Sequence, residues 1–434
     1  MDVVVVGAGL GGLAAAVAAH RAGHAVTVLE RAAGLRETGA GIGVMPNGVR
    51  ALDALGLGGP VRERALPLPA GGGLRDRHGR PLLAADQSAI TARSGAPVVV
   101  VDRTWLHRLL AAALPADAAP VPVGSGNGGP PVLVRTGTAV DAVRDDGDRV
   151  RIELAGGAAV GGWPRPRRPD AGSADTREPG AELTADLVVV ADGAGSRLRA
   201  ALFPRHPGLE RSGEHAARAL VPAGGGGAGP VREADVRAVA GELLDHRTGE
   251  RFGVMPLADG RTYWYATWPA TRPLPSDPVG LLAALRVRRA DWHPAVAALL
   301  AATDPDAVHV TETVRLAAPL PALAVGRVAL LGDAAHAMTP DLAQGGCQAF
   351  EDAAALGALL TGAGPADVPA LLTRYDALRR PRTAALQRQA RQTNRLLRLR
   401  GPAGRLRDAA LRAVPGSLAT AALARQFAFD PPRR

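Results

Sequence analysis

The sequence predicts an α/β protein in which a Rossmann-type parallel sheet is interleaved with a second, mostly antiparallel sheet and followed by C-terminal helices. Short, largely apolar segments at 2–6, 25–29, 187–191 and 328–331 are typical of strands buried on both faces, and each runs into glycines or an acid. From about residue 206 to 325, apolar and polar residues alternate instead, which indicates antiparallel strands with one covered face.

The most specific pattern lies at the N-terminus. The strand at 2–6 runs into a G-x-G-x-x-G motif with glycines at positions 7, 9 and 12, then into a helix and a second strand that ends at Glu30. The first glycine permits a tight turn, the second lets a pyrophosphate approach the backbone, and the third lets helix and strand pack closely. The N–H groups that begin the helix attract the phosphates. A carboxylate at Glu30 would accept both ribose hydroxyls of adenosine and repel a 2′-phosphate, so the site should hold FAD or NAD rather than NADP.

Composition and charge exclude several classes of protein. The apolar N-terminus lacks the basic region of a signal peptide, and no segment has the roughly eighteen uninterrupted apolar residues of a membrane span. We therefore expect a cytoplasmic protein with no stable membrane association. All of the basic residues behind the net charge of +10 are arginine, which indicates compositional bias rather than a nucleic-acid partner. Cys347 is the only cysteine, so neither an internal disulfide nor a cysteine metal site is expected.

The next candidate ligand contacts lie between residues 37 and 114. A glycine-rich loop is expected over 37–47, and it could either lie over a bound ring system or connect surface elements. The strand at 97–101 ends in Asp102 and Arg103, and a helix follows over 105–114. Arg103 at this junction is either a phosphate or ribityl contact or a surface arginine.

Asp192 and Gly193 follow the strand at 187–191, so they are expected at the carboxyl edge of the sheet. There a carboxylate and a flexible backbone would border a ligand crevice. Alone, this pair could simply form a turn. Further strands are predicted at 132–134, 139–144 and 149–154, between low-complexity loops at 115–131 and 155–182.

The segment from 206 to 325 is expected to supply the antiparallel sheet. Its predicted elements are strands at 236–243, 251–257, 262–268 and 308–315 and a helix over 281–302. Aromatic side chains gather between Tyr263 and Trp268, where a packed core and an aromatic-lined substrate pocket explain them about equally well.

A second motif follows the last buried strand. Asp333 sits at the strand end, after Gly332, where it could accept a ribityl hydroxyl. Gly345 and Gly346 open a helix whose N-terminus could face an electron-rich group, such as the N1–C2=O edge of a reduced flavin. His336, between these points, is either an acid/base group or a structural side chain. A long arginine-rich helix is expected to follow over 371–399, with its arginines on a solvated face.

Three segments in this order resemble the group A FAD-dependent monooxygenases, which have the para-hydroxybenzoate hydroxylase fold. They are Gly7 to Gly12 with Glu30, Asp192-Gly193, and Gly332-Asp333 through Gln348 with Glu351-Asp352. The loop at 39–47 and the Asp102-Arg103 junction match the subset with urate hydroxylases, salicylate-type hydroxylases and zeaxanthin epoxidase. The resemblance spans residues 1 to about 400, and it does not specify a substrate.

The resemblance implies a flavoprotein that binds FAD, takes electrons transiently from NADH or NADPH, and uses O2 through a flavin C4a-hydroperoxide to hydroxylate or epoxidise a small ring-containing molecule. The residues it implies in FAD binding are Gly7, Gly9, Leu10, Gly12, Glu30, Arg31, Gly43, Arg103, Asp192, Gly193, Gly332, Asp333, Pro340, Gln344, Gly345 and Gly346. The substrate pocket candidates are His215, Arg218 and Pro340, and no other catalytic side chain is assigned. No metal is expected.

The resemblance also divides the chain. The expected FAD-binding segments are 1–74, 102–205 and 326–380, the substrate-domain segments are 75–101 and 206–325, and a helical region covers 381–434. Two residues depart from the family pattern, which usually has Asn and Gly where this chain has Asp341 and Ala343. Asp341 would oppose a negative reduced flavin unless it is protonated or turned away, and Ala343 removes backbone freedom beside the ring. An FAD-dependent reductase or dehydrogenase and a non-catalytic flavin-binding protein remain alternatives.

Overall fold

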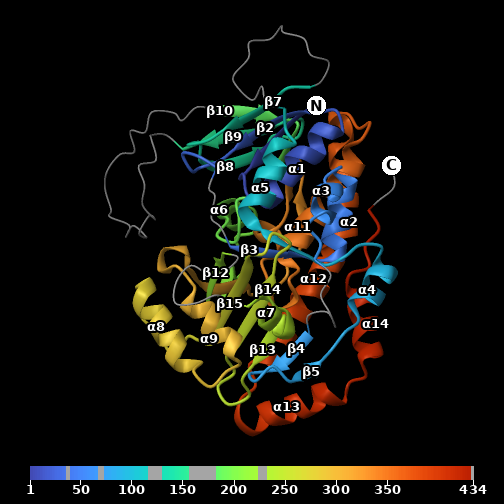
Figure 1. The fold of residues 1–434 in the computed structure, drawn as a ribbon. Helices are drawn as coiled ribbons and strands as arrows, with labels where there is room; N and C mark the ends of the chain where they lie inside the picture. The colour runs from blue at the N-terminus through green and yellow to red at the C-terminus, as the bar shows by residue number, and fades with distance from the viewer. Residues whose placement is uncertain (36–39, 67–72, 116–129, 156–181, 223–231, 432–434) are drawn as a thin grey trace, which may run out of the picture.

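The computed structural model describes residues 1–35, 40–66, 73–115, 130–155, 182–222 and 232–431 (Figure 1). A mostly parallel six-stranded sheet forms one half of the molecule. In spatial order its strands are β17 (Ala324–Val325), β18 (Val328–Leu330), β11 (Leu187–Val190), β1 (Asp2–Val6), β2 (Ala25–Leu29) and β7 (Val132–Arg135), with only β17 antiparallel to its neighbour. The Rossmann-type parallel sheet is therefore confirmed.

Two helices of this half pack closely together. Helix α1 (Leu10–Arg21) lies against α11 (Gly345–Leu360), and a Cβ added at Gly357 would lie 2.9 Å from the Cβ of Ala18. Helix α5 (Arg103–Ala112) also packs on α1. A separate antiparallel sheet at one end consists of β8 (Val140–Asp145), β9 (Val150–Leu154) and β10 (Glu182–Ala185). These contacts fix the N-termini of α1 and α11, which border the candidate site.

A seven-stranded, mostly antiparallel sheet forms the other half. In spatial order its strands are β16 (His309–Leu316), β12 (Leu209–Val221), β15 (Thr262–Pro269), β14 (Arg251–Pro256), β13 (Gly241–Leu244), β4 (Gly73–Asp76) and β5 (Pro81–Leu83). One face is covered by α7 (Glu233–Val239), α8 (Pro278–Arg288) and α9 (Pro294–Ala301), and its core includes Phe252, Trp264 and Trp268. We call the opposite face the inner face, because it is turned towards the half that contains the parallel sheet (Figure 1).

Short elements join the two halves. Strands β3 (Gly41–Val44) and β6 (Val99–Asp102) pair between them (Figure 1). The remaining helices and 3₁₀ turns are α2 (Pro46–Ala54), α3 (Gly58–Arg62), α4 (Gln87–Ser94), α6 (Arg197–Leu202), α10 (Asp333–His336), η1 (Pro305–Ala307), η2 (Pro340–Leu342), η3 (Pro365–Asp367), α12 (Val368–Leu397), α13 (Gly401–Ala413) and α14 (Gly416–Gln426). The last three complete the expected C-terminal helices. Among the helices of the described ranges, none has both the length and the apolar character needed to cross a bilayer.

Three sequence predictions of local structure are wrong. The described part of the loop predicted over 37–47 contains strand β3, whose pairing with β6 no local pattern reveals. The strand predicted at 236–243 is α7 followed by β13, because Val236 and Val239 are buried at helical spacing. The helix predicted over 281–302 is broken into α8 and α9, since Pro294 begins a new helix. The low-complexity loops predicted around 115–131 and 155–182 lie mostly outside the described residues.

Candidate active site

A cavity of about 300 Å³ lies at the carboxyl ends of β1, β2 and β11. The residues that line it include Gly7, Gly9, Glu30, Arg31, Arg103, His107, Asp192 and Gly193. Side chains and backbone from separate stretches of the sequence therefore border one crevice, at the place where doubly wound sheets bind their ligands.

The three glycines of the N-terminal motif occupy different environments. Gly7 has φ +105°, and a Cβ there would lie 2.5 Å from the carbonyl oxygen of Ala191. A Cβ at Gly12 would lie 1.9 Å from the carbonyl oxygen of Gly7, so helix α1 and strand β1 pack too closely for any side chain. A Cβ at Gly9 would meet nothing within 4 Å, which leaves open space beside the backbone. The Leu10 side chain is buried in the core and does not line the cavity.

The Glu30 carboxylate is held at the cavity wall by backbone donors. Its two oxygens accept from the N–H groups of Ala8, at 2.8 Å, and Ala32, at 2.9 Å. Each oxygen keeps further acceptor capacity for a ligand hydroxyl. The Arg31 side chain beside it is exposed. His107, which the sequence did not single out, donates from Nε2 to the carbonyl of Ala8 at 2.7 Å and so supports the glycine-rich turn.

Two carboxylates with raised pKa values lie near the cavity. Burial raises the pKa of Asp192, and its Oδ1 atom has no hydrogen-bond partner among the described residues. Desolvation by the surrounding protein also raises the pKa of Asp333, although the residue is solvent-exposed, and His336, Arg103 and Arg199 oppose this effect. An orphaned buried carboxylate oxygen is costly unless a ligand donor reaches it, and the hydroxyls of a dinucleotide are such donors. The open space at Gly9 and this orphaned oxygen both fit a bound dinucleotide.

A second group of segments converges near Asp333. A Cβ at Gly345, the first residue of α11, would lie 3.8 Å from Oδ1 of Asp333, and one at Gly346 would lie 3.2 Å from Cδ1 of Ile42. A Cβ at Gly43 would lie 4.0 Å from the Cβ of Ala343. Three elements therefore meet here: strand β3, the turn that begins with Pro340, and the N-terminus of α11. Of the non-glycine residues in the described part of the chain, only Ala343 has a positive φ, at 51°.

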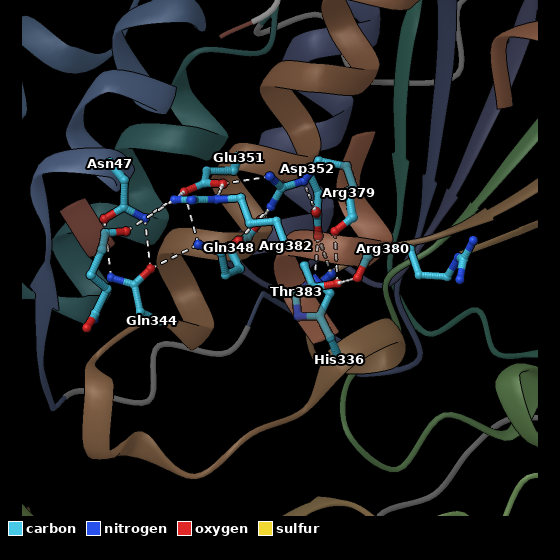
Figure 2. Close-up of polar contacts among 12 residues, drawn as sticks. Asn47, His336, Gln344, Gln348, Glu351, Asp352, Arg379, Arg380, Arg382 and Thr383 are labelled. Carbon is cyan, nitrogen blue, oxygen red and sulfur yellow. Dashed lines mark hydrogen bonds and ion pairs between the residues drawn. The ribbon is translucent and has the colours of Figure 1, made fainter. Parts of the chain in front are cut away.

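The turn before α11 is fixed by a buried polar network (Figure 2). Gln344 is fully buried and exchanges side-chain amide hydrogen bonds with Asn47 of α2. Glu351, one helical turn beyond Gln348, accepts from Asn47 at 2.7 Å and from Gln348 at 3.0 Å. Two arginines of α12 complete the network: Arg379 and Arg382 each approach Glu351 Oε2 at 2.6 Å. The Arg379 side chain is 2% exposed, so the prediction that the arginines of this helix lie on a solvated face is wrong for Arg379.

His336 belongs to the same buried region. Its Nε2 lies 2.6 Å from Oδ2 of Asp352, and its side chain is 1% exposed. Asp352 also accepts from the backbone N–H of Gly332, which has φ +58°, and from Nε of Arg379 at 2.7 Å. Between the two roles left open for it, this environment favours a structural one for His336.

Asp341 does not carry an isolated charge. Its Oδ1 accepts from Nη1 of Arg251 at 2.7 Å and from Nδ2 of Asn394 at 3.2 Å, and its side chain is fully buried. Sequence reasoning missed Arg251, because the two residues lie ninety positions apart and only the approach of β14 to η2 brings them together. The Arg251 guanidinium offsets the negative charge that Asp341 would otherwise place near the turn.

The two candidates on β12 point to opposite faces of the sheet. His215 stacks on Trp268 of the helix-covered face, with ring centroids 5.8 Å apart. Arg218 is on the inner face, where its Nη2 donates to Thr311 Oγ1 at 2.5 Å. Alternate residues of a strand face opposite sides, so these two side chains do not share one pocket.

Comparisons with known proteins agree with this geometry. A family model described as "FAD binding domain" matches residues 1–390. Aurachin C monooxygenase/isomerase of Stigmatella aurantiaca is 32% identical over 379 residues, covering 87% of this chain and 85% of the relative. FAD-dependent urate hydroxylase of Klebsiella pneumoniae is 31% identical, covering 90% of this chain and 89% of the relative.

Solved structures show the same fold. Klebsiella pneumoniae HpxO complexed with FAD and uric acid has a TM-score of 0.79 and 27% identity, covering 98% of this chain and 96% of that one. A salicylate hydroxylase substrate complex has a TM-score of 0.69 at 24% identity, covering 100% and 98% of the two chains, which shows the shared fold alone. The chain therefore belongs to the family of FAD-dependent aromatic monooxygenases that contain this FAD-binding domain, and its cofactor is FAD.

Proposed function

We propose that this monooxygenase uses NADH or NADPH and O2 to hydroxylate or epoxidise a small ring-containing molecule. The observation that carries the proposal is the convergence of Gly43, Asp333 and Gly345 at the N-terminus of α11, opposite the inner face of the seven-stranded sheet. A flavin ring bound there would have protein on one side and room for a substrate towards the sheet. FAD supplies the electron transfer and oxygen activation when it is bound.

The chain's own residues would hold the cofactor at several points. We assign the pyrophosphate to the backbone of Gly7 to Gly12 and the start of α1, where the helix dipole favours an anion. Glu30 would accept the adenosine ribose hydroxyls. Arg103 and Asp333 would contact the ribityl–pyrophosphate region, and Asp192-Gly193 would serve FAD and the transient nicotinamide donor.

The flavin ring would lie against Pro340 and the segment from Gln344 to Gly346. Backbone N–H groups at the start of α11 would stabilise the negative charge of the reduced ring. Arg251 would prevent Asp341 from opposing that charge. The division of the chain into interleaved FAD-binding and substrate segments, with their boundaries as expected from the sequence, is part of this proposal.

Isotope incorporation tests the proposed reaction. FAD-loaded protein is mixed with NADH or NADPH and candidate ring compounds under ¹⁸O2, and the products are analysed by mass spectrometry. One labelled oxygen in a product is expected for at least one compound that stimulates nicotinamide oxidation. Turnover that continues without oxygen would favour a reductase, and bound FAD with no nicotinamide oxidation would favour a non-catalytic protein.

A further inference from the structure

On the inner face of the seven-stranded sheet, four residues from four neighbouring strands lie in a row across the strands. The strand registers pair Arg218 of β12 with Tyr265 of β15, Tyr265 with Gly253 of β14, and Gly253 with Glu242 of β13. All four alternate with residues of the helix-covered core, so they project towards the FAD-binding half. Tyr263 lies two residues before Tyr265 on β15, so it is on the same face, and its ring packs on the backbone of Gly41 in β3.

Gly253 allows Tyr265 and Glu242 to meet across strand β14. A Cβ at Gly253 would lie 2.0 Å from Cε1 of Tyr265, so the aromatic ring occupies the space where a side chain would stand. The Tyr265 hydroxyl and the Glu242 carboxylate on β13, two strands away, lie close enough to influence each other's pKa. Glu242 stands at one end of the row and Arg218 at the other, three strand spacings or about 14 Å away, with Tyr265 on the strand next to Arg218.

The Glu242 end of the row has more acids than bases. Arg251 approaches Glu214 at 3.2 Å, Glu242 at 3.2 Å and Asp341 at 2.7 Å. The Arg251 side chain is 3% exposed, and those of the three acids are between 0% and 12% exposed. Of these three acids, Arg398 approaches Glu214 alone, at 3.9 Å, and its side chain is 30% exposed. One buried guanidinium therefore faces three carboxylates, and the Asn394 amide donates to Glu214 at 2.6 Å without adding charge. Buried negative charge that is only partly offset is unfavourable.

A second observation indicates a missing donor. Oδ2 of Asp341 is buried and has no hydrogen-bond partner among the described residues, although Oδ1 has two. Nη1 of Arg251 contacts both Asp341 and Glu242, so the orphaned oxygen and the Glu242 carboxylate belong to one site. Burial also raises the pKa of Glu242, which is the response of a carboxylate that lacks sufficient positive charge nearby.

We propose that Glu242 and the Tyr265 hydroxyl bind a protonated amine of the ring-containing substrate. This inference rests on the proposed function, because it places the substrate between the flavin ring and the inner face. An ammonium group supplies both the positive charge and the N–H donors that the site lacks. A carboxylate at the same end would add to the excess negative charge, and a neutral hydroxyl would supply a donor without the charge.

Matched ligands test this inference. Binding to the FAD-loaded protein is measured at pH 7 by calorimetry for two sets of compounds: benzylamine, benzyl alcohol and benzoate, and tryptamine, tryptophol and indole-3-acetate. In at least one set we expect the amine to bind about tenfold more tightly than its two counterparts, which corresponds to about 1.4 kcal/mol. Glu242→Gln should remove this preference and change the affinity for the alcohol by less than about twofold.

Two further variants keep the test decisive. Tyr265→Phe keeps the ring over Gly253 and should weaken amine binding by a smaller factor, even if Glu242→Gln fails to fold. Glu233→Gln, on the surface of α7, is the control and should bind every ligand as the wild type does. A carboxylate or alcohol that binds best in both sets, or an amine preference that survives Glu242→Gln, would overturn the inference. If a product contained labelled oxygen but the protein showed no preference for amines, this inference alone would be wrong. If the protein preferred amines but incorporated no labelled oxygen into any product, the proposed reaction would be wrong.

Discussion

Gln344 and Asn47 exchange side-chain amide hydrogen bonds, at 2.8 Å and 3.2 Å, inside the protein. Gln344 directly precedes α11, and Asn47 lies in the first turn of α2. This pair connects helix α2, which follows β3, with the turn where we propose that the flavin ring binds. Because both side chains are fully buried and paired, the position of the turn depends on the polar network around them.

Removing the charge of Glu351 should destabilise the fold strongly. Glu351→Gln leaves Arg382 without a carboxylate and Arg379 with Asp352 alone. Breaking a buried ion pair from one side costs about 3 kcal/mol or more. Urea unfolding of the FAD-loaded protein measures the change. The control is Arg380→Gln, because Arg380 pairs with Asp376 at the surface and should contribute less than about 1 kcal/mol. If both variants lost the same unfolding free energy, the buried network around Glu351 would stabilise the fold no more than a surface ion pair does.

Glycine at position 343 should stabilise the protein. Ala343 has φ 51° and ψ 32°, a left-handed conformation that costs an alanine about 1 kcal/mol relative to glycine. Ala343→Gly is therefore expected to raise the unfolding free energy by up to about 1 kcal/mol, less the extra chain entropy of glycine. Ala353→Gly, inside α11, should lower it by about 1 kcal/mol. A loss of stability in Ala343→Gly would contradict the prediction, because the strain relieved would then be smaller than the chain entropy that glycine adds to the unfolded state.

Features that depend on neighbouring residues in the chain could be predicted from the sequence. Glu30 and Asp333 follow apolar segments that become buried strands, so their places at the sheet edge follow from the local pattern. The pair Arg251–Asp341 depends on the packing of two distant segments, which no local pattern reveals. His215 and Arg218 were grouped because strand β12 was not predicted; alternation along a strand would have separated them.

The glycines at positions 9 and 12 should differ in what their replacement disturbs. Gly12→Ala forces a Cβ against the Gly7 carbonyl, so we expect loss of the folded FAD-binding half. Gly9→Ala meets no protein atom, but its methyl group enters the space assigned to the pyrophosphate. We expect this variant to keep the apoprotein's unfolding midpoint and to raise the Kd for FAD by about tenfold or more.

Fluorescence titration with FAD and denaturant unfolding of the apoprotein separate these two effects. Gly34→Ala is the matched control, since a Cβ there also meets nothing within 4 Å but lies outside the glycine motif. It should leave both quantities unchanged. If Gly9→Ala bound FAD as tightly as the wild type, the pyrophosphate would have to lie elsewhere in the cavity.

Asp352 should make stability depend on pH in the acid range. Burial opposes ionisation of Asp352, but His336 and the Arg379 guanidinium outweigh it and lower the pKa of its carboxyl from 3.8 to about 2. A depressed pKa means that the folded state favours the ionised form, so this stabilisation is complete above about pH 4 and is lost as the pH falls towards 2.

Asp352→Asn should therefore lower stability at pH 7 and flatten its decline between pH 4 and pH 2. Urea midpoints measured across this range would show the difference in slope. Asp306→Asn, an exposed residue of η1, is the control and should keep the wild-type slope. An unchanged slope in Asp352→Asn would mean that Asp352 binds its proton equally well in the folded and unfolded states, and that the ion pair with Arg379 does not contribute to the acid sensitivity of the fold.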